Sequence, residues 1–289
     1  MIKIERTRER VNSNGGQVLV GALLDQFGFD VASDALTVDG RRCRRVPNSS
    51  CLRAYIGLLA EGRTAFDEIE PFRNDKLFRE ALKLSSVPSS PTLRQRLVKA
   101  NGAFDVCLRQ GNVRFLSTCS LGTVSCAAGE RVPVDVDVSC LDNSRSRKQG
   151  VGRTYRGYDG FAPIFAYVGT EGYMLLDELR PGKQHCQKDT PEFLRQCLEA
   201  VESLGTVRPL FRLDSGNDAV DNLRVLHDRA DYVIKRNLRR ETPEEWLDTA
   251  RRYGTPDSPR PGKTVWRGSV WRSFKDDEGS ILPCESFSK

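Results

Sequence analysis

The sequence lacks the residue patterns from which most structural metal and redox centres are built. It has two histidines and nine cysteines, and no two cysteines form a C-x-x-C pair. A disulfide framework or a structural zinc site is therefore not expected, and we interpret the cysteines as reduced thiols in a cytosol. No run approaches the roughly 20 apolar residues that span a bilayer, and the opening MIKIERTRER lacks the apolar segment of a signal peptide. These absences predict a soluble, cytoplasmic protein that does not associate with membranes.

A large excess of one charge sign is also lacking. The 45 Lys and Arg residues against 39 Asp and Glu residues give a formal charge of +6. So small an excess favours a polyanionic partner only mildly, because it is common in proteins that never bind nucleic acid. The positive charge is concentrated locally, since four arginines occupy five consecutive positions: Arg41, Arg42, Arg44 and Arg45. Such a cluster either binds phosphate or is a solvated loop, and the sequence leaves both interpretations open.

The hydrophobic pattern changes near residue 129. Before it, apolar residues recur at helical spacing. After it, alternating and short apolar runs predict strands separated by helices. Three strands, a helix and then alternating strand and helix predict an α/β fold, a mixed sheet with flanking helices in the order of a ribonuclease H-like core. The expected early helices cover 14–29, 49–62 and 73–84; the expected strands cover 131–141, 161–169, 173–179, 207–216 and 230–236, with helices over 190–205 and 217–229.

Three regions follow from this pattern. A mainly helical region covers 1–128, the α/β core covers 129–237, and a third region covers 238–289. In the third region we expect a helix over 237–254, a loop over 255–262 and an alternating segment over 263–274 that opens a hairpin. No closing amphipathic helix follows, although a ribonuclease H-like core normally ends with one.

Two acidic residues stand on alternate positions of a strand made otherwise of valines, in VDVDVS. The period of two puts the valines on one face and Asp135, Asp137 and Ser139 on the other. A strand covered on both faces is normally apolar throughout, and a buried, unpaired carboxylate is costly. Either the strand lies at an edge and both acids are solvated, or a divalent cation pairs with a carboxylate.

A second strand repeats the design. In LFRLDSG an apolar run ends with Asp214, and Ser-Gly lets the chain turn away. In the expected order the first and fourth strands are neighbours, so Asp137 and Asp214 are predicted to meet. Carboxylates on adjacent strands suit phosphoryl transfer with two metal ions. Mg²⁺ prefers oxygen ligands, so His185 and His227 are not needed as ligands.

At this point the residues resemble a known family. The stretches VDVDVSCLDNS, GVGRTYRGYDG, LRPGKQH and RLDSG are similar to the catalytic core of Asp-Asp-Glu transposases of bacterial insertion sequences, most of all the insertion-sequence family numbered thirteen-eighty. The resemblance implies that Asp137 and Asp214 are the first two catalytic acids, with Asp135 as the alternative should the register differ by one pleat. Arg180 and His185 match a family turn, and whether they serve catalysis or only connect a strand to a helix stays open.

The same resemblance implies a DNA recombinase that cleaves and joins DNA with two Mg²⁺ or Mn²⁺ ions. Its partners would be terminal inverted repeats and target DNA, bound by the helical region among others and held by a homodimer in a synaptic complex at the bacterial nucleoid. The third acid of the family, a glutamate, lies on a helix after a β-rich insertion. Neither Glu278 nor Glu285 stands in a segment of helical period. We therefore expect a C-terminally truncated transposase with little activity of its own, or else a DNA-binding repressor derived from one; a host nuclease of the same fold is a third hypothesis.

Further basic and aromatic residues are candidate DNA contacts. Basic side chains near a metal site would engage phosphates, but a solvated loop explains them equally well. Trp266 and Trp271 either insert near a distorted DNA end or complete a small core, and the second reading is favoured. The basic candidates after the first acid are Arg147, Lys148, Arg153 and Arg156, with Asn143, Arg145, Tyr155 and Tyr158 among them.

Overall fold

The computed structural model describes residues 14–38, 45–118, 131–205, 209–239, 241–275 and 281–288, the segments 271–275 and 281–288 by their backbone alone. The chain divides into two compact units, residues 1–121 and 122–289, and each is described by itself. Of the described helices, none combines the length and apolar character that a membrane crossing needs.

The first unit is helical, as the sequence predicts. Gly21 shows how closely its helices pack, because a Cβ there would lie 1.8 Å from the carbonyl oxygen of Ala81. Asp75 caps one helix by accepting a hydrogen bond from the backbone N–H of Phe78 at 3.1 Å. The described helices are α1 (Gln17–Phe27), α2 (Asp30–Ala35), α3 (Asn48–Ala60), the 3₁₀ helix η1 (Phe66–Asn74), α4 (Lys76–Ala81), α5 (Ser90–Ala100) and α6 (Ala103–Thr118).

A buried cation joins three of these helices. The side chain of Arg53 in α3 is 5% exposed and donates to Asp30 of α2 at 2.6 Å and to Asp25 of α1 at 2.9 Å. Burial opposes ionisation of Asp25, but hydrogen bonds from Lys83 and Arg53 outweigh it and hold the pKa of this carboxyl below its ordinary value. The Arg53 cluster is therefore part of what fixes the helices against one another.

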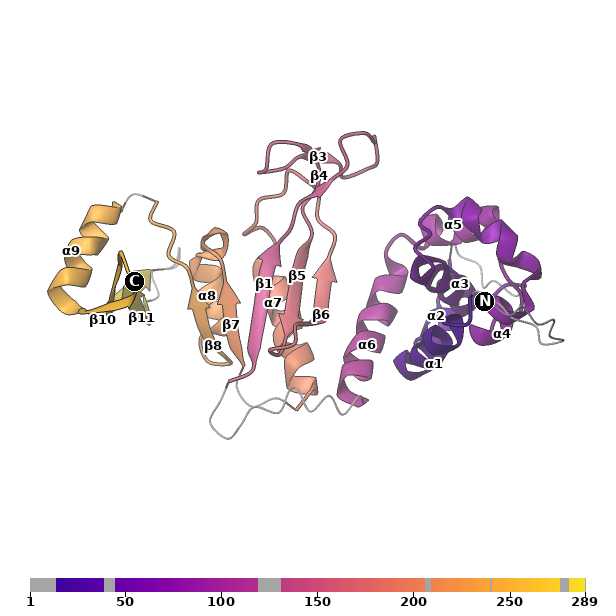
Figure 1. The fold of residues 1–289 in the computed structure, drawn as a ribbon, viewed down its shortest axis with the longest axis horizontal. Coiled ribbons are helices and arrows are strands. Elements are labelled where there is room, and N and C mark those ends of the chain that lie inside the picture. The colour runs from indigo at the N-terminus through magenta and orange to yellow at the C-terminus, as the bar shows by residue number, and fades with distance from the viewer. Residues whose placement is uncertain are drawn as a thin grey trace, which may run out of the picture. The chain divides into compact units, whose positions relative to one another are not determined.

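The second unit is built on a mixed five-stranded sheet (Figure 1). Its strands lie in the order β6-β5-β1-β7-β8. The first strand pairs antiparallel with β5 and parallel with β7, so the first and fourth of these strands are neighbours, as predicted. The strands are β1 (Pro133–Val138), β5 (Ile164–Val168), β6 (Tyr173–Glu178), β7 (Leu210–Leu213) and β8 (Asp231–Ile234).

The two faces of this sheet differ sharply. Val134 and Val136 in β1 are buried, 0% and 2% exposed. Helices α7 (Thr190–Ser203) and α8 (Val220–Leu226) contact each other. Their apolar residues and the valines of β1 are buried, so both helices lie on the valine side of the sheet. The opposite face carries Asp137 in β1 and Arg212 in β7, both exposed, and Val233 in β8, which is 57% exposed. The prediction of a mixed sheet with flanking helices is confirmed, and within the described residues both helices cover the same face. A central strand thus carries acids because one of its faces is open to solvent.

The described part of this unit also contains two smaller sheets. The first has the order β2-β4-β3, with β2 (Leu141–Asp142), β3 (Gly152–Arg153) and β4 (Asp159–Phe161), and the sequence did not predict it. The second has the order β11-β10-β9, with β9 (Thr255–Arg260), β10 (Lys263–Lys275) and β11 (Ile281–Ser288).

The third predicted region needs two corrections. The loop expected over 255–262 was wrong, because residues 255–260 form β9 and pair with β10 despite their two prolines, as is tolerated at a sheet edge. The helix expected over 237–254 is α9 (Pro243–Tyr253), which begins later because Thr242 caps it with a hydrogen bond from the N–H of Glu245 at 3.2 Å. The hairpin expected from 263–274 is confirmed by the antiparallel pairing of β10 with β11.

Candidate catalytic carboxylates and nucleic-acid interface

The register of the parallel pair brings the two predicted acids together. Pro133 lies opposite Leu210, and Val136 lies opposite Leu213. One residue further, the same register places Asp137 opposite Asp214. Both strands run in the same direction, so the two carboxylates lie at the carboxyl end of adjacent central strands, and both residues are exposed.

Each of these carboxylates is hydrogen-bonded through one oxygen. Oδ1 of Asp137 accepts from the backbone N–H of Val138 at 2.8 Å. Oδ1 of Asp214 accepts from the backbone N–H of Gly216 at 3.1 Å and from the side-chain amide of Asn217 at 2.8 Å. Among the described residues no donor engages the Oδ2 atom of either acid. The arrangement therefore leaves one oxygen of each carboxylate available at the carboxyl ends of the two central strands.

The alternative acid, Asp135, is engaged differently. Its two oxygens accept from Nε and Nη2 of Arg212 at 2.5 and 2.6 Å, across the β1–β7 pair. The hydrogen bond to Asp135 raises the pKa of Arg212 above its ordinary value, although burial opposes the shift. A carboxylate with both oxygens in a bidentate ion pair is a poorer cation ligand than one with a free oxygen, so the geometry favours Asp137 over Asp135.

The turn with Arg180 and His185 leads from β6 to α7, and its Pro181 forms a bridge with Phe161 of β4. Arg180 is 2% exposed, pairs with Glu178 at 2.9 Å and donates to Oγ1 of Thr190 at 2.9 Å. Arg180 therefore anchors the start of α7, whereas His185 is exposed. Next to it, Sγ of Cys186 donates to the carbonyl oxygen of Gly216 at 3.1 Å. Burial first, and the charge of Asp214 second, raise the pKa of the Cys186 thiol, which keeps it neutral beside the acid.

The basic residues that follow Asp137 in the sequence lie on a small sheet that is hydrogen-bonded to the end of β1. We call the β2-β4-β3 sheet and its loops the basic tip. Its tyrosines tie it to the end of β1, because Tyr155 donates to the carbonyl oxygen of Val138 at 3.3 Å and Tyr158 to that of Cys140 at 3.0 Å. Four exposed basic residues project from it without an acidic partner in the described part of the chain: Arg147, Lys148, Arg153 and Arg156.

The arginine cluster of the first unit is described only in part. Arg41, Arg42 and Arg44 lie outside the described residues, and Arg45 is exposed. Trp266 is half-buried and lies opposite Pro256 in the β9–β10 pair, which agrees with a packing role; the side chain of Trp271 lies outside the described residues.

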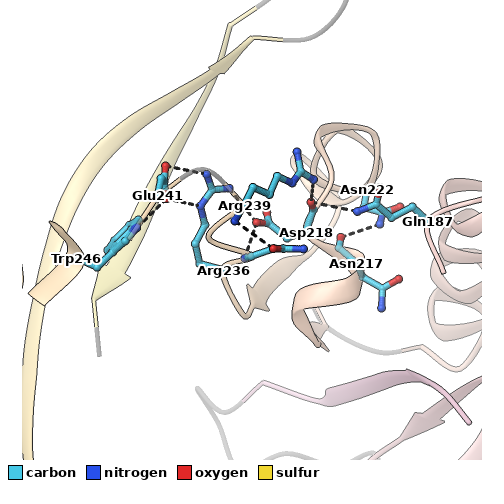
Figure 2. A network of polar contacts seen from close by, with 9 residues as sticks. Gln187, Asn217, Asp218, Asn222, Arg236, Arg239, Glu241 and Trp246 are labelled. Carbon is cyan, nitrogen blue, oxygen red and sulfur yellow. Dashed lines mark hydrogen bonds and ion pairs between the residues drawn. The ribbon is translucent and has the colours of Figure 1, made fainter. Parts of the chain in front are cut away.

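Sequence reasoning missed a polar network behind the second acid (Figure 2). We call residues 214–218 the Asp214 loop. Asp218, 6% exposed, accepts from Nη1 of Arg236 and from the backbone N–H of Asn237, both at 2.9 Å. Arg236 also pairs with Glu241 at 3.1 Å, and Glu241 accepts from the indole N–H of Trp246 at 2.7 Å. The network ties the Asp214 loop to α9.

Comparison with known proteins gives a family and two solved structures. The family model described as "Transposase DDE domain group 1" matches residues 1–251. No curated protein matches the chain significantly. A piggyBac transposase synaptic complex with hairpin DNA is 12% identical with a TM-score of 0.37; the match covers 98% of this chain and 53% of that one, so this chain spans about half its length. A Mos1 transposase paired-end complex with left transposon end is 12% identical with a TM-score of 0.27, covering 72% of this chain and 64% of that one.

Proposed function

Because the chain belongs to the transposase DDE domain group 1 family, we propose that it is a DNA transposase in which Asp137 and Asp214 are catalytic carboxylates. The observation that carries this assignment is the β1–β7 register, which sets the two acids opposite each other on adjacent parallel strands. The strand order β6-β5-β1-β7-β8 supports a ribonuclease H-like core, and the sequence motifs support membership of the insertion-sequence family numbered thirteen-eighty.

The donor set suits a hard divalent cation. Membership of a DDE transposase family implies divalent metal use in general. Carboxylate oxygens are the ligands that Mg²⁺ prefers, and Mn²⁺ accepts the same set. We assign two such ions to the carboxyl ends of β1 and β7, held by the Oδ2 atoms of Asp137 and Asp214. When bound, two ions would activate the attacking oxygen and stabilise the leaving oxygen of a phosphodiester.

The chain's own residues then bind and orient DNA. The basic tip begins directly after β1, so phosphates held by Arg147, Lys148, Arg153 and Arg156 would lie next to Asp137. The substrates we propose are the terminal inverted repeats of the element and its target DNA. The helical first unit, with the Arg41–Arg45 cluster, would contact the repeats, and two copies of the chain would pair in a synaptic complex at the nucleoid.

A third carboxylate is expected from the family resemblance. Within the described residues no group of three or more His, Cys, Asp or Glu side chains is placed to hold a metal ion. We propose that a glutamate completes the site. A second candidate function is a repressor that binds the inverted repeats through the helical first unit without cleaving them.

The two functions are separated by one assay on DNA that carries the inverted repeats flanking the gene. Band shifts measure binding, and strand cleavage is followed with and without Mg²⁺, in the 289-residue chain and in any longer reading frame. In a cleaving form, Asp137→Asn or Asp214→Asn should abolish cleavage and spare binding. Retained cleavage in either variant would refute the assignment. Binding without cleavage in every form would support the repressor function instead.

A further inference from the structure

A buried asparagine lies against the carboxylate of Asp214. Asn217 is 0% exposed, and its Nδ2 donates to Oδ1 of Asp214 at 2.8 Å. The same oxygen also accepts a hydrogen bond from the backbone N–H of Gly216 at 3.1 Å. Two donors on one oxygen fix the rotation of the carboxylate, and the other oxygen is left facing away from them.

The backbone of Asn217 is itself held in place. Its backbone carbonyl accepts from Nδ2 of Asn222 at 2.8 Å, and Asn222 is also 0% exposed (Figure 2). Its backbone N–H donates to the carbonyl oxygen of Asp214 at 3.2 Å. The amide has one usable orientation, because turning it over would set its oxygen against the carboxylate.

That orientation has a cost. Oδ1 of Asn217 is buried and has no hydrogen-bond partner within the described residues. Buried polar atoms are nearly always satisfied, and an exception asks for a reason. A residue selected only for packing would not need an amide here, whereas a residue selected to hold Asp214 needs its N–H group.

The first acid is oriented by a shorter route. Oδ1 of Asp137 accepts from the N–H of the next residue, Val138, in the strand itself. Asp214 lies beyond the end of β7, where no strand pairing of its own fixes it. The second acid therefore needs a side chain to do what the sheet does for the first.

We propose that Asn217 is the positioning residue for Asp214, holding one carboxylate oxygen so that the other is presented to a divalent cation. This inference rests on the proposed function of Asp214. Partners that orient a metal-binding side chain typically change metal affinity by about 10-fold to 100-fold when they are removed.

The test measures Mn²⁺ binding to the 289-residue chain directly, by electron paramagnetic resonance of the free ion, with no DNA and no turnover. We expect Asn217→Ala to weaken Mn²⁺ binding by roughly 10-fold or more. The matched control is Asn222→Ala in α8, which removes an equally buried amide that holds the Asn217 backbone but does not contact Asp214. It measures how much loosening of the loop contributes, and it should weaken Mn²⁺ binding by about 3-fold at most. Thermal unfolding identifies variants that do not fold, and Asn217→Ser serves in place of the alanine variant if needed.

Asp214→Asn in the same titration separates the two levels of the argument. If Asp214→Asn weakens Mn²⁺ binding and the Asn217 variants do not, the positioning role is wrong and the metal site stands. Equal losses in the Asn217 and Asn222 variants would also overturn the positioning role, because loosening of the loop would explain both. If Asp214→Asn has no effect, the metal site itself fails.

Discussion

The Asp218 network offers a quantitative test of how the second acid is supported. Asp218→Asn keeps the shape of the side chain and removes its charge. The substitution weakens two hydrogen bonds to Oδ2, from Arg236 and from the N–H of Asn237. Hydrogen bonds to charged groups contribute about 1.5–3 kcal/mol each. Arg236 keeps its pair with Glu241, so the full cost of about 3–5 kcal/mol for an orphaned buried charge is not reached.

We therefore expect Asp218→Asn to lower the free energy of unfolding by about 2 kcal/mol, which is about 1 M in the urea midpoint for a slope of about 2 kcal/mol/M. Tryptophan fluorescence is a suitable probe, because all three tryptophans lie in the second unit and Trp246 belongs to the network. The matched control is Asp221→Asn, an exposed acid paired with Arg224 at 3.6 Å, which should cost about 0.5 kcal/mol or less. Equal midpoints for the two variants would refute the reasoning.

Three further predictions concern the helical unit and the basic tip. Arg53→Leu should cost about 3 kcal/mol in thermal unfolding followed by circular dichroism, because it leaves Asp30 without its cation and Asp25 with Lys83 alone; an unchanged transition would contradict the role of the cluster. The folded-state pKa of Asp25 is lowered, so its contribution to stability is present above about pH 4 and is lost as the pH falls below that value; Asp25→Asn should flatten this part of the stability profile, and an equally steep profile would be inconsistent with it. Replacing Arg153 and Arg156 together by Ala should weaken DNA binding and reduce the salt slope by about 2, whereas Arg195→Ala on α7, already paired with Glu192 at 2.8 Å, should change neither; equal effects would leave the tip a solvated loop.

The five strands of the main sheet followed from the sequence because each has a local pattern, and the neighbouring of the first and fourth followed from the ribonuclease H-like order. The alternation in VDVDVS set valines and acids on opposite faces, and the Ser-Gly after Asp214 marked the end of β7. Once β1 and β7 are neighbours, their register alone decides whether Asp137 and Asp214 lie opposite each other. The solvated reading of the acid strand was half right, since the strand is central and its acid face is nevertheless exposed.

The parts that were missed depend on contacts far apart in the chain. The β2-β4-β3 sheet consists of strands of two or three residues, too short to show a period. The strand β9 contains two prolines, which read as a loop until its pairing with β10 is known. Asp218, Arg236 and Glu241 look like ordinary surface charges in the sequence, and only the fold reveals that they form one partly buried network.

The central claim is that Asp137 and Asp214 share a divalent cation, and iron-directed backbone cleavage tests it most directly. Fe²⁺ replaces Mg²⁺ in the 289-residue chain, ascorbate and peroxide generate radicals at the bound ion, and the cut sites are mapped by mass spectrometry. We predict cuts next to both positions 137 and 214, suppressed by excess Mg²⁺ and lost in Asp137→Asn and in Asp214→Asn. Cuts near only one of the two positions, or cuts that persist in both variants, would contradict the claim.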